Sequence, residues 1–227
     1  MKALISGSAL GLGIAAVPAA AATIIDNTTH GLYNAGIGTV LDGTNPFGGN
    51  FMFPLANVAG GDPSLDIPAA NEPDLSAAAG ALGNWLTNPA SPGGSWSAGP
   101  VAIPLTWAVN TETAIIYALD AGPGKLLKNV VATFGVDNGL FVWLNGVFQG
   151  GHLRPGGVVL GEFVVNLGDL GPGTHYLQLL REDHGGATGY AVSITADIAA
   201  IPLPAAGWLL LAGLGGLVAV RRRRRAA

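Results

Sequence analysis

Residues 134–146 have the sequence Phe-Gly-Val-Asp-Asn-Gly-Leu-Phe-Val-Trp-Leu-Asn-Gly. The run Leu140–Leu144 in its middle is apolar at every position, which is typical of a central strand buried on both faces. An Asn-Gly pair stands on each side of this run, and Asn-Gly tolerates the positive φ angles of a tight hairpin turn. The segment therefore predicts a hairpin turn at 137–139, a second one at 145–146, and an antiparallel sheet around them.

Further strand patterns flank this segment at short intervals on both sides. In the last of them, Tyr190, Val192 and Ile194 alternate with polar residues, which predicts one face toward a core. No strand–helix–strand rhythm appears, so the fold class expected is all-β, an antiparallel β-sandwich. The other expected strands are Val101–Val109 (with an edge or bulge at Pro104), Thr113–Leu119, Asn129–Val136, Val158–Leu167 and Thr174–Arg181.

The composition of the 227 residues fits a turn-rich chain with a real core. There are 36 glycines and 15 prolines, and no cysteine, which excludes disulfides and cysteine-based zinc or nucleophile chemistry. Residues 23–100 are rich in Gly, Asn and Pro, and contain one expected helix, Leu75–Leu86, with Asp74 as its N-cap. We expect 23–100 to supply outer strands and loops of one sandwich domain, 23–200, whose core strands lie in 101–198; a separate N-terminal domain is the alternative.

The first 22 residues have the pattern of a secretory signal peptide. Lys2 supplies the positive charge, Ala3–Ala16 is uncharged and mostly apolar, and Ala20-Ala21-Ala22 offers a cleavage site. A first transmembrane helix is the alternative, but the run is shorter than the roughly 20 residues that a span needs. The Sec translocon and signal peptidase are therefore expected partners.

The last 27 residues combine a proline-rich motif, an apolar run and a basic cluster. The motif is Ile201, Pro202, Leu203, Pro204, Ala205; the apolar run is Trp208–Val220; the cluster is Arg221, Arg222, Arg223, Arg224, Arg225. About 16 residues can be helical, or about 24 Å, slightly short for a hydrocarbon core of about 30 Å. The arginines would stay in the cytoplasm and the body outside it, by the positive-inside rule.

This tail resembles the PEP-CTERM sorting signals, and within them the VPLPA-CTERM variant, from which it departs only by Ile201 in place of Val. The resemblance covers residues 201–227 and implies a transmembrane helix and recognition by an exosortase, a membrane-embedded transpeptidase that cleaves near the motif. It implies an intermediate anchored in the inner membrane, followed by the outer surface or extracellular matrix. A plain C-terminal membrane anchor is the alternative.

The region between signal and tail is strongly acidic. All fourteen Asp and Glu lie there with only Lys125, Lys128, Arg154 and Arg181, a formal charge of −10 with histidines neutral. Such a surface repels phosphate backbones, so nucleic acid is excluded as a partner. The terminal arginines, beside an apolar run, indicate topology rather than nucleic-acid binding.

The segment 134–146 and the later Leu-Gly-Pro-Gly-Thr-His-Tyr-Leu-Gln-Leu at 170–179 resemble galactose-binding-like jelly-roll modules, over about 106–197. The resemblance implies a jelly-roll sandwich and allows ligands of many kinds, or a purely structural role. Such modules often carry a structural calcium ion, although the resemblance does not mark its ligands.

Polysaccharide binding requires an aromatic face and polar groups that contact hydroxyls. The candidates within a dozen residues are Trp143, Asn145, Gln149, His152 and Arg154. The alternative places Trp143 in the core and the others in solvated turns. Trp85, Trp96 and Trp107 are further aromatic candidates, and the first two lie in loop-like sequence, where exposure is easier.

Calcium prefers six to eight oxygen ligands from loops, and two loops supply them. The candidate ligands are Asp62 and Asp66, with Glu72 and Asp74 nearby, and Asp137 with Asn138. Their spacing is not that of an EF-hand loop, and no other cofactor is expected.

Residues 181–186, Arg-Glu-Asp-His-Gly-Gly, are the densest charge cluster of the body. Glu182 or Asp183 could serve as the acid/base of a secreted glycoside hydrolase, and His184 with His152 or His175 could contribute to a zinc site. The alternative is a hairpin loop in which Arg181 and Glu182 form a solvated pair. The favoured interpretation is a non-enzymatic exported protein, with a carbohydrate-active enzyme or a purely structural surface protein as rivals.

Overall fold

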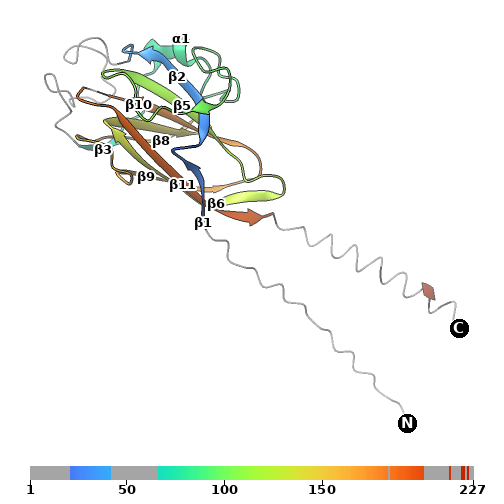
Figure 1. The fold of residues 1–227 in the computed structure, drawn as a ribbon. Helices are drawn as coiled ribbons and strands as arrows, with labels where there is room; N and C mark the ends of the chain where they lie inside the picture. Colours follow the sequence, from blue (N-terminus) through green and yellow to red (C-terminus); the bar gives the residue numbers. More distant parts are fainter. Residues whose placement is uncertain are drawn as a thin grey trace.

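The computed structural model describes residues 21–41, 66–183 and 185–201, and in the tail Gly215, Arg221, Arg222 and Arg224. Two antiparallel sheets pack face to face (Figure 1), so the predicted β-sandwich is confirmed. The smaller sheet has the order β1 (Ala21–Asp26), β11 (Gly189–Ala200), β6 (Lys125–Asp137) and β9 (Phe163–Leu170). The larger has the order β3 (Ile67–Ala70), β8 (Val147–Leu153), β7 (Gly139–Leu144), β10 (His175–Glu182), β5 (Glu112–Leu119), β2 (His30–Gly38) and β4 (Val101–Ala102).

The main core fills the space between the two sheets, and period-2 alternation decides which side chains enter it. Tyr190, Val192 and Ile194 of β11 all belong to it, as their alternation predicted. From the larger sheet, Ile115 and Tyr117 of β5 face them and are almost completely buried.

A second apolar cluster covers the outer face of the larger sheet. Phe141 and Trp143 of β7 pack there against Leu82 and Trp85, which come from the segment between β3 and β4. Strand β7 is therefore buried on both faces, which is why all of its residues from Leu140 to Leu144 are apolar.

The predicted helix over Leu75–Leu86 is shorter than expected. A 3₁₀ turn, η1 (Ser76–Ala78), leads into one turn of α-helix, α1 (Ala79–Leu82). The carboxylate of Asp74 accepts a hydrogen bond from the Ser76 N–H, 2.9 Å away. The helix ends at Gly83, where φ is 59° and a Cβ atom would lie 2.2 Å from the Pro92 carbonyl oxygen. Only glycine fits this close passage of the chain.

One of the two predicted hairpins is wrong. The turn at 145–146 does join the paired strands β7 and β8, with φ of 51° at Asn145 and 77° at Gly146. Residues 137–139, in contrast, connect β6 to β7, which lie in different sheets. Of the two Asn-Gly pairs, Asn145-Gly146 has the positive φ angles of a tight hairpin and Asn138-Gly139 does not. Long-range pairing determines whether the next strand joins the same sheet.

The expected hairpin after Arg181 is wrong for the same reason. Strand β10 pairs with β5 and β7, whereas β11 pairs with β1 and β6 in the opposite sheet. The expected strand Val101–Val109 is also reduced to Val101–Ala102, an edge strand beside β2. Pro104 lies outside it, consistent with the missing N–H of proline.

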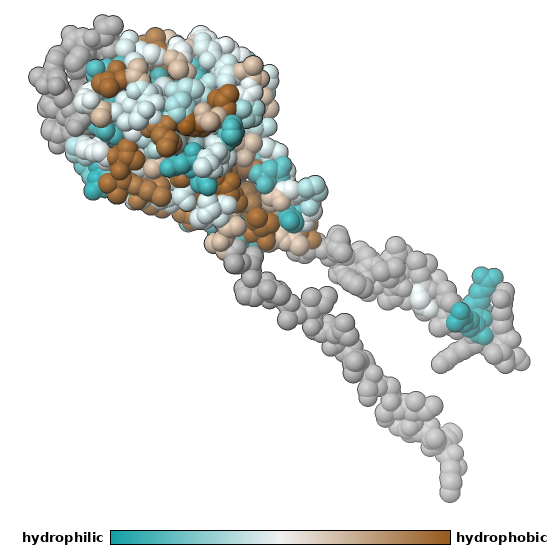
Figure 2. All heavy atoms as spheres, in the orientation of Figure 1, coloured by the Kyte–Doolittle hydropathy of each residue, from teal (hydrophilic) through white to brown (hydrophobic). Residues whose placement is uncertain are grey.

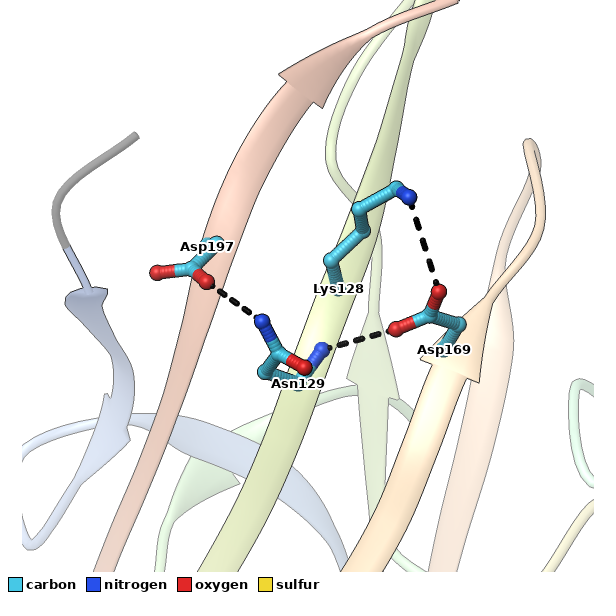
Figure 3. Close-up of polar contacts among 4 residues, drawn as sticks. All are labelled: Lys128, Asn129, Asp169 and Asp197. Carbon is cyan, nitrogen blue, oxygen red and sulfur yellow. Dashed lines mark hydrogen bonds and ion pairs between the residues drawn. The ribbon is translucent and has the colours of Figure 1, made fainter. Parts of the chain in front are cut away.

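The exposed face of the smaller sheet carries a polar network at an irregularity of β6 (Figure 3). Asn129 has φ of 51°, and the pairing of β6 with both neighbours shifts register around it. Its side-chain amide donates to Asp197 at 2.7 Å, and its backbone N–H donates to Asp169 at 3.0 Å. Lys128 Nζ lies 3.7 Å from the same Asp169 carboxylate. The polar groups of Asn129, Asp169 and Asp197 thus have hydrogen-bond partners, which stabilise the irregularity in β6.

The first and last strands of the sandwich lie side by side, since Ala21 at the start of β1 pairs with Asp197 near the end of β11. Within the described residues, no helix is long and apolar enough to cross a membrane. Of the expected signal peptide, residues 1–20 fall outside the described residues, while Ala21 and Ala22 begin β1 and pair with β11. The expected span Trp208–Val220 falls outside the described residues, apart from Gly215. Arg221, Arg222 and Arg224 are exposed.

Candidate functional site

A cleft of about 340 Å³ opens at one side of the sandwich. It lies where the smaller sheet ends at β9 and the larger sheet ends at β8 and β3, so neither sheet closes this side. The lining residues are Pro68, Ala69, Ala70, Leu140, Val142, Gln149, Gly150, Gly151, His152, Phe163, Val164, Val165 and Asn166. Its volume is at the lower end of the range typical of small-ligand sites.

His152 bridges the two sheets at this cleft. Its ring meets the ring of Phe163 edge-on, with 4.1 Å between centroids, and its Nε2 lies 3.0 Å from Asp66 Oδ1. The side chain of His152 is 18% exposed and that of Asp66 is 51% exposed. The aspartate thus fixes the imidazole while leaving Nδ1 as the nitrogen for a ligand.

Two amides supply the remaining polar side chains of the cleft. Gln149 donates from Nε2 to the Val147 carbonyl at 2.9 Å, and Asn166 accepts from the Gly168 N–H at 2.9 Å. These bonds engage the Gln149 nitrogen and the Asn166 oxygen. The Gln149 oxygen and its second N–H, and the Asn166 nitrogen, keep hydrogen-bonding capacity for a ligand.

Aliphatic side chains surround this side of the molecule. Val164 is 62% exposed, and Val159 and Leu160 in the loop before β9 are also exposed. Figure 2 shows hydrophobic atoms gathered where β9 lies in Figure 1. The cleft therefore combines a few polar groups with an apolar floor and rim.

The structure brings together only part of the predicted sugar-binding set. Gln149 and His152 line the cleft, but Trp143 is fully buried and donates from Nε1 to Glu72 Oε1 at 2.7 Å. Trp143 therefore packs in the core, as the alternative interpretation held, because β7 is covered on both faces. Asn145 lies in the β7–β8 turn, and its side-chain oxygen accepts from the Tyr176 N–H at 2.9 Å.

Asn145 and His152 lie near opposite ends of β8. Phe148, beside the turn, and His152 are four residues apart, which is about 13 Å along a strand. Arg154 follows β8, is exposed, and is not among the lining residues. The four predicted residues Trp143, Asn145, His152 and Arg154 therefore do not form one site.

The other tryptophans do not form an exposed aromatic surface. Trp85 is buried, contrary to the expectation for a loop residue, and stacks on Trp96 with 5.9 Å between centroids. Trp96 donates from Nε1 to the Leu82 carbonyl, and Trp107 from Nε1 to the Thr111 carbonyl. Among the described residues, the exposed large hydrophobic side chains are all aliphatic.

Three of the predicted calcium ligands, Asp66, Asp137 and Asn138, lie in the described part of the chain, and each has its own protein contacts. Asp137 and Asn138 are buried, and the Asn138 amide donates to Asp137 Oδ1 at 2.7 Å. Asp66 contacts His152 and precedes β3, which β8 separates from β7, and Asp62 lies outside the described residues. In the described ranges, no three His, Asp or Glu side chains are grouped so that they could hold a metal ion.

The charge cluster at 181–183 is not the solvated pair that the sequence suggested. Arg181, Glu182 and Asp183 are all fully buried. Successive residues of a strand point to opposite faces, so Arg181 enters the space between the sheets and Glu182 faces the other way. Asp183 Oδ2 accepts backbone N–H bonds from Asn110 at 2.6 Å and Gly185 at 3.1 Å.

Arg181 is the buried cation of the sandwich interior, which sequence reasoning missed. Its guanidinium carbon lies 4.2 Å from the Trp107 ring centroid, 4.8 Å from that of Tyr190 and 5.6 Å from that of Tyr33. Nε donates to Thr113 Oγ1 at 3.0 Å and Nη1 donates to the Pro104 carbonyl at 2.9 Å. Burial lowers the pKa of Arg181 and raises that of Tyr190 well above its usual value.

The zinc hypothesis finds no support in the placement of the histidines. His184 lies outside the described residues, and His152 contacts Asp66 at the cleft. His175 instead contacts Asn145 and the Gly171 carbonyl, both at 3.0 Å, beside the β7–β8 turn. His152 and His175 are thus held at different places by different partners.

Comparison with known proteins adds little to this geometry. No protein-family model matches the chain, and no curated protein matches it. Among solved structures, a PA14 sugar-binding domain from an RTX adhesin is similar over 77% of this chain and 98% of its own, with 16% identity and a TM-score of 0.33. A glycosyl hydrolase family 2 member from Bacteroides cellulosilyticus DSM 14838 is similar over 44% of this chain, with 13% identity and a TM-score of 0.32. This chain spans 17% of that hydrolase, and neither likeness carries a functional argument.

Proposed function

We propose that this protein is an exported surface protein whose β-sandwich binds polysaccharide without cleaving it. The cleft between β8 and β9 carries the proposal, because it joins an apolar floor to three polar side chains, Gln149, His152 and Asn166. Sugars present hydroxyl groups together with C–H faces, and a small cleft of mixed character suits both. The polysaccharide would belong to the cell envelope or extracellular matrix.

Two observations favour binding over hydrolysis. A general acid must reach the glycosidic oxygen, whereas Glu182 and Asp183 are fully buried. The described residues that line the cleft include no Asp or Glu, so they offer no carboxylate pair of the kind that most glycosidases use.

Export and sorting are part of the same proposal. The Sec translocon would export the chain, signal peptidase would cleave after Ala22, and an exosortase-type enzyme would act near the motif at 201–205. Strand β11 ends at Ala200, and the Ile201 N–H still donates to the Gly124 carbonyl at 2.9 Å. Cleavage at Ile201–Ala205 would therefore leave the paired strands of the sandwich intact. Cleavage after Ala22 would shorten β1 by two residues.

The test is a panel of polysaccharides assayed for both binding and release of reducing ends, with the full-length protein in mild detergent. Ala69 is exposed and lines the cleft, so Ala69→Trp should fill it and weaken binding. The matched control is Ala102→Trp, since Ala102 is exposed on β4 at the opposite edge of the larger sheet.

Binding that Ala69→Trp reduces and Ala102→Trp leaves unchanged is the expected result, with no reducing ends released. Equal binding by the wild type, Ala69→Trp and Ala102→Trp would mean that polysaccharide binds outside the cleft. Turnover of any glycan by the wild-type chain would instead support the carbohydrate-active enzyme.

A further inference from the structure

The described lining of the cleft carries no acidic residue, lysine or arginine, although the body around it is strongly acidic. Among the described residues thirteen line the cleft, and none of them is Asp, Glu, Lys or Arg. Resting on the proposed function, we infer that the cleft selects polysaccharides of uncharged sugar units and excludes acidic ones such as uronates.

The polar atoms left for a ligand match hydroxyl groups. They include the Gln149 oxygen and its second amide N–H, the Asn166 nitrogen and His152 Nδ1. A hydroxyl both donates and accepts, so it can pair with each of these atoms. A carboxylate only accepts, so it can use only the donors among them, and none of the described lining residues is Lys or Arg.

Burying a carboxylate in this cleft would therefore be unfavourable. The floor includes Leu140, Val142 and Phe163, all buried residues of the main core. A charged group loses hydration beside such a surface, and that loss is offset only by hydrogen bonds or an opposite charge. The same floor suits the C–H faces of neutral sugars.

The negative charge of the protein around the cleft also disfavours acidic polysaccharides. Asp66 lies 3.0 Å from His152 at the cleft and is half exposed, and residues 23–200 carry a formal charge of −10. An acidic polymer is repelled at low ionic strength, where exposed charges act over about 10 Å or more. Arg154, the cation nearest in sequence, does not line the cleft.

The experiment compares two polymers that differ only in charge: polygalacturonate and its carboxyl-reduced, neutral counterpart of equal length. Equilibrium binding of the full-length protein in mild detergent is measured at low and high salt. At low salt the neutral polymer should bind about tenfold more tightly or better, a typical size for an electrostatic bias. The ratio should shrink as salt screens the repulsion.

A charge placed at the cleft should reduce this selectivity. Gln149 is exposed and lines the cleft, so Gln149→Lys adds a cation there and should raise the acidic-to-neutral binding ratio several-fold. Val147→Lys is the matched control, since Val147 is 64% exposed, lies two residues away on β8, and does not line the cleft. Its ratio should stay close to that of the wild type.

Equal or tighter binding of polygalacturonate by the wild-type protein would overturn the inference while leaving polysaccharide binding in place. The same ratio for Gln149→Lys and Val147→Lys would also overturn it, because selection would then not occur at the cleft. If no polymer of the panel binds, the proposed function itself fails.

Discussion

Arg181 should be the most sensitive position of the sandwich interior, and three substitutions separate its contributions. The side chain donates hydrogen bonds to Thr113 and Pro104 and lies against the rings of Tyr33, Trp107 and Tyr190. Hydrogen bonds of a charged group contribute about 1.5–3 kcal/mol each, and a desolvated cation–π contact about 2 kcal/mol. Against this, removing the charge from water costs several kcal/mol.

Arg181→Ala loses every contact and leaves a cavity, so we expect a loss of about 4–5 kcal/mol in the free energy of unfolding. Arg181→Met keeps most of the volume and removes the desolvation cost, so the loss should be about 1–2 kcal/mol. Arg181→Lys keeps a buried charge but loses the planar group that stacks on Trp107, so it should fall between them, at about 3 kcal/mol.

The assay is urea unfolding of the full-length chain, followed by tryptophan fluorescence, since Trp107 lies against the guanidinium. The order of stability expected is wild type, then Met, Lys and Ala, with similar denaturant slopes. A lysine variant as stable as the wild type would refute the reasoning, because charge alone would then suffice. A methionine variant as unstable as the alanine variant would refute it too, because apolar volume would contribute nothing.

Three further predictions concern other parts of the chain. At the β6 bulge, Asn129→Ala and Asn129→Gly both lose the bond to Asp197, but alanine should cost about 1–2 kcal/mol more because φ is 51°, and equal losses in urea unfolding would contradict this. Burial raises the pKa of Tyr190, so the stability it supports is complete below about pH 10 and falls as alkali ionises the unfolded state first; Tyr190→Phe should flatten this decline in alkaline unfolding curves. Intact mass of the protein from its host should begin at Thr23 and end within Ile201–Ala205; a membrane-bound form that retains all five terminal arginines would contradict sorting.

The candidate site could be predicted only in part. Gln149 and His152 were recognisable as polar residues near a strand, but nothing in their neighbourhood pointed to Phe163 or Asn166, which approach from β9 in the other sheet. The pattern of residues 158–167 did indicate a strand there. That this strand ends its sheet, and so borders a cleft, depends on which strands pair.

The sequence by itself predicts local features of this protein, namely which strand residues enter the core and where a tight turn forms. Alternation in β11 identified Tyr190, Val192 and Ile194 as core residues, because side chains of a strand point to opposite faces in turn. The Asn-Gly pair at 145–146 identified a true hairpin, because its conformational freedom is a property of those two residues.

Only the tertiary structure decided what lies far apart in the chain. The turn at 137–139 crosses between sheets, Arg181 is buried among rings from three other segments, and β8 and β9 border one cleft. Each of these depends on contacts between residues distant in sequence, whose energies act only once the sheets have packed. A short pattern records which conformation a residue prefers, but not which strand will lie beside it.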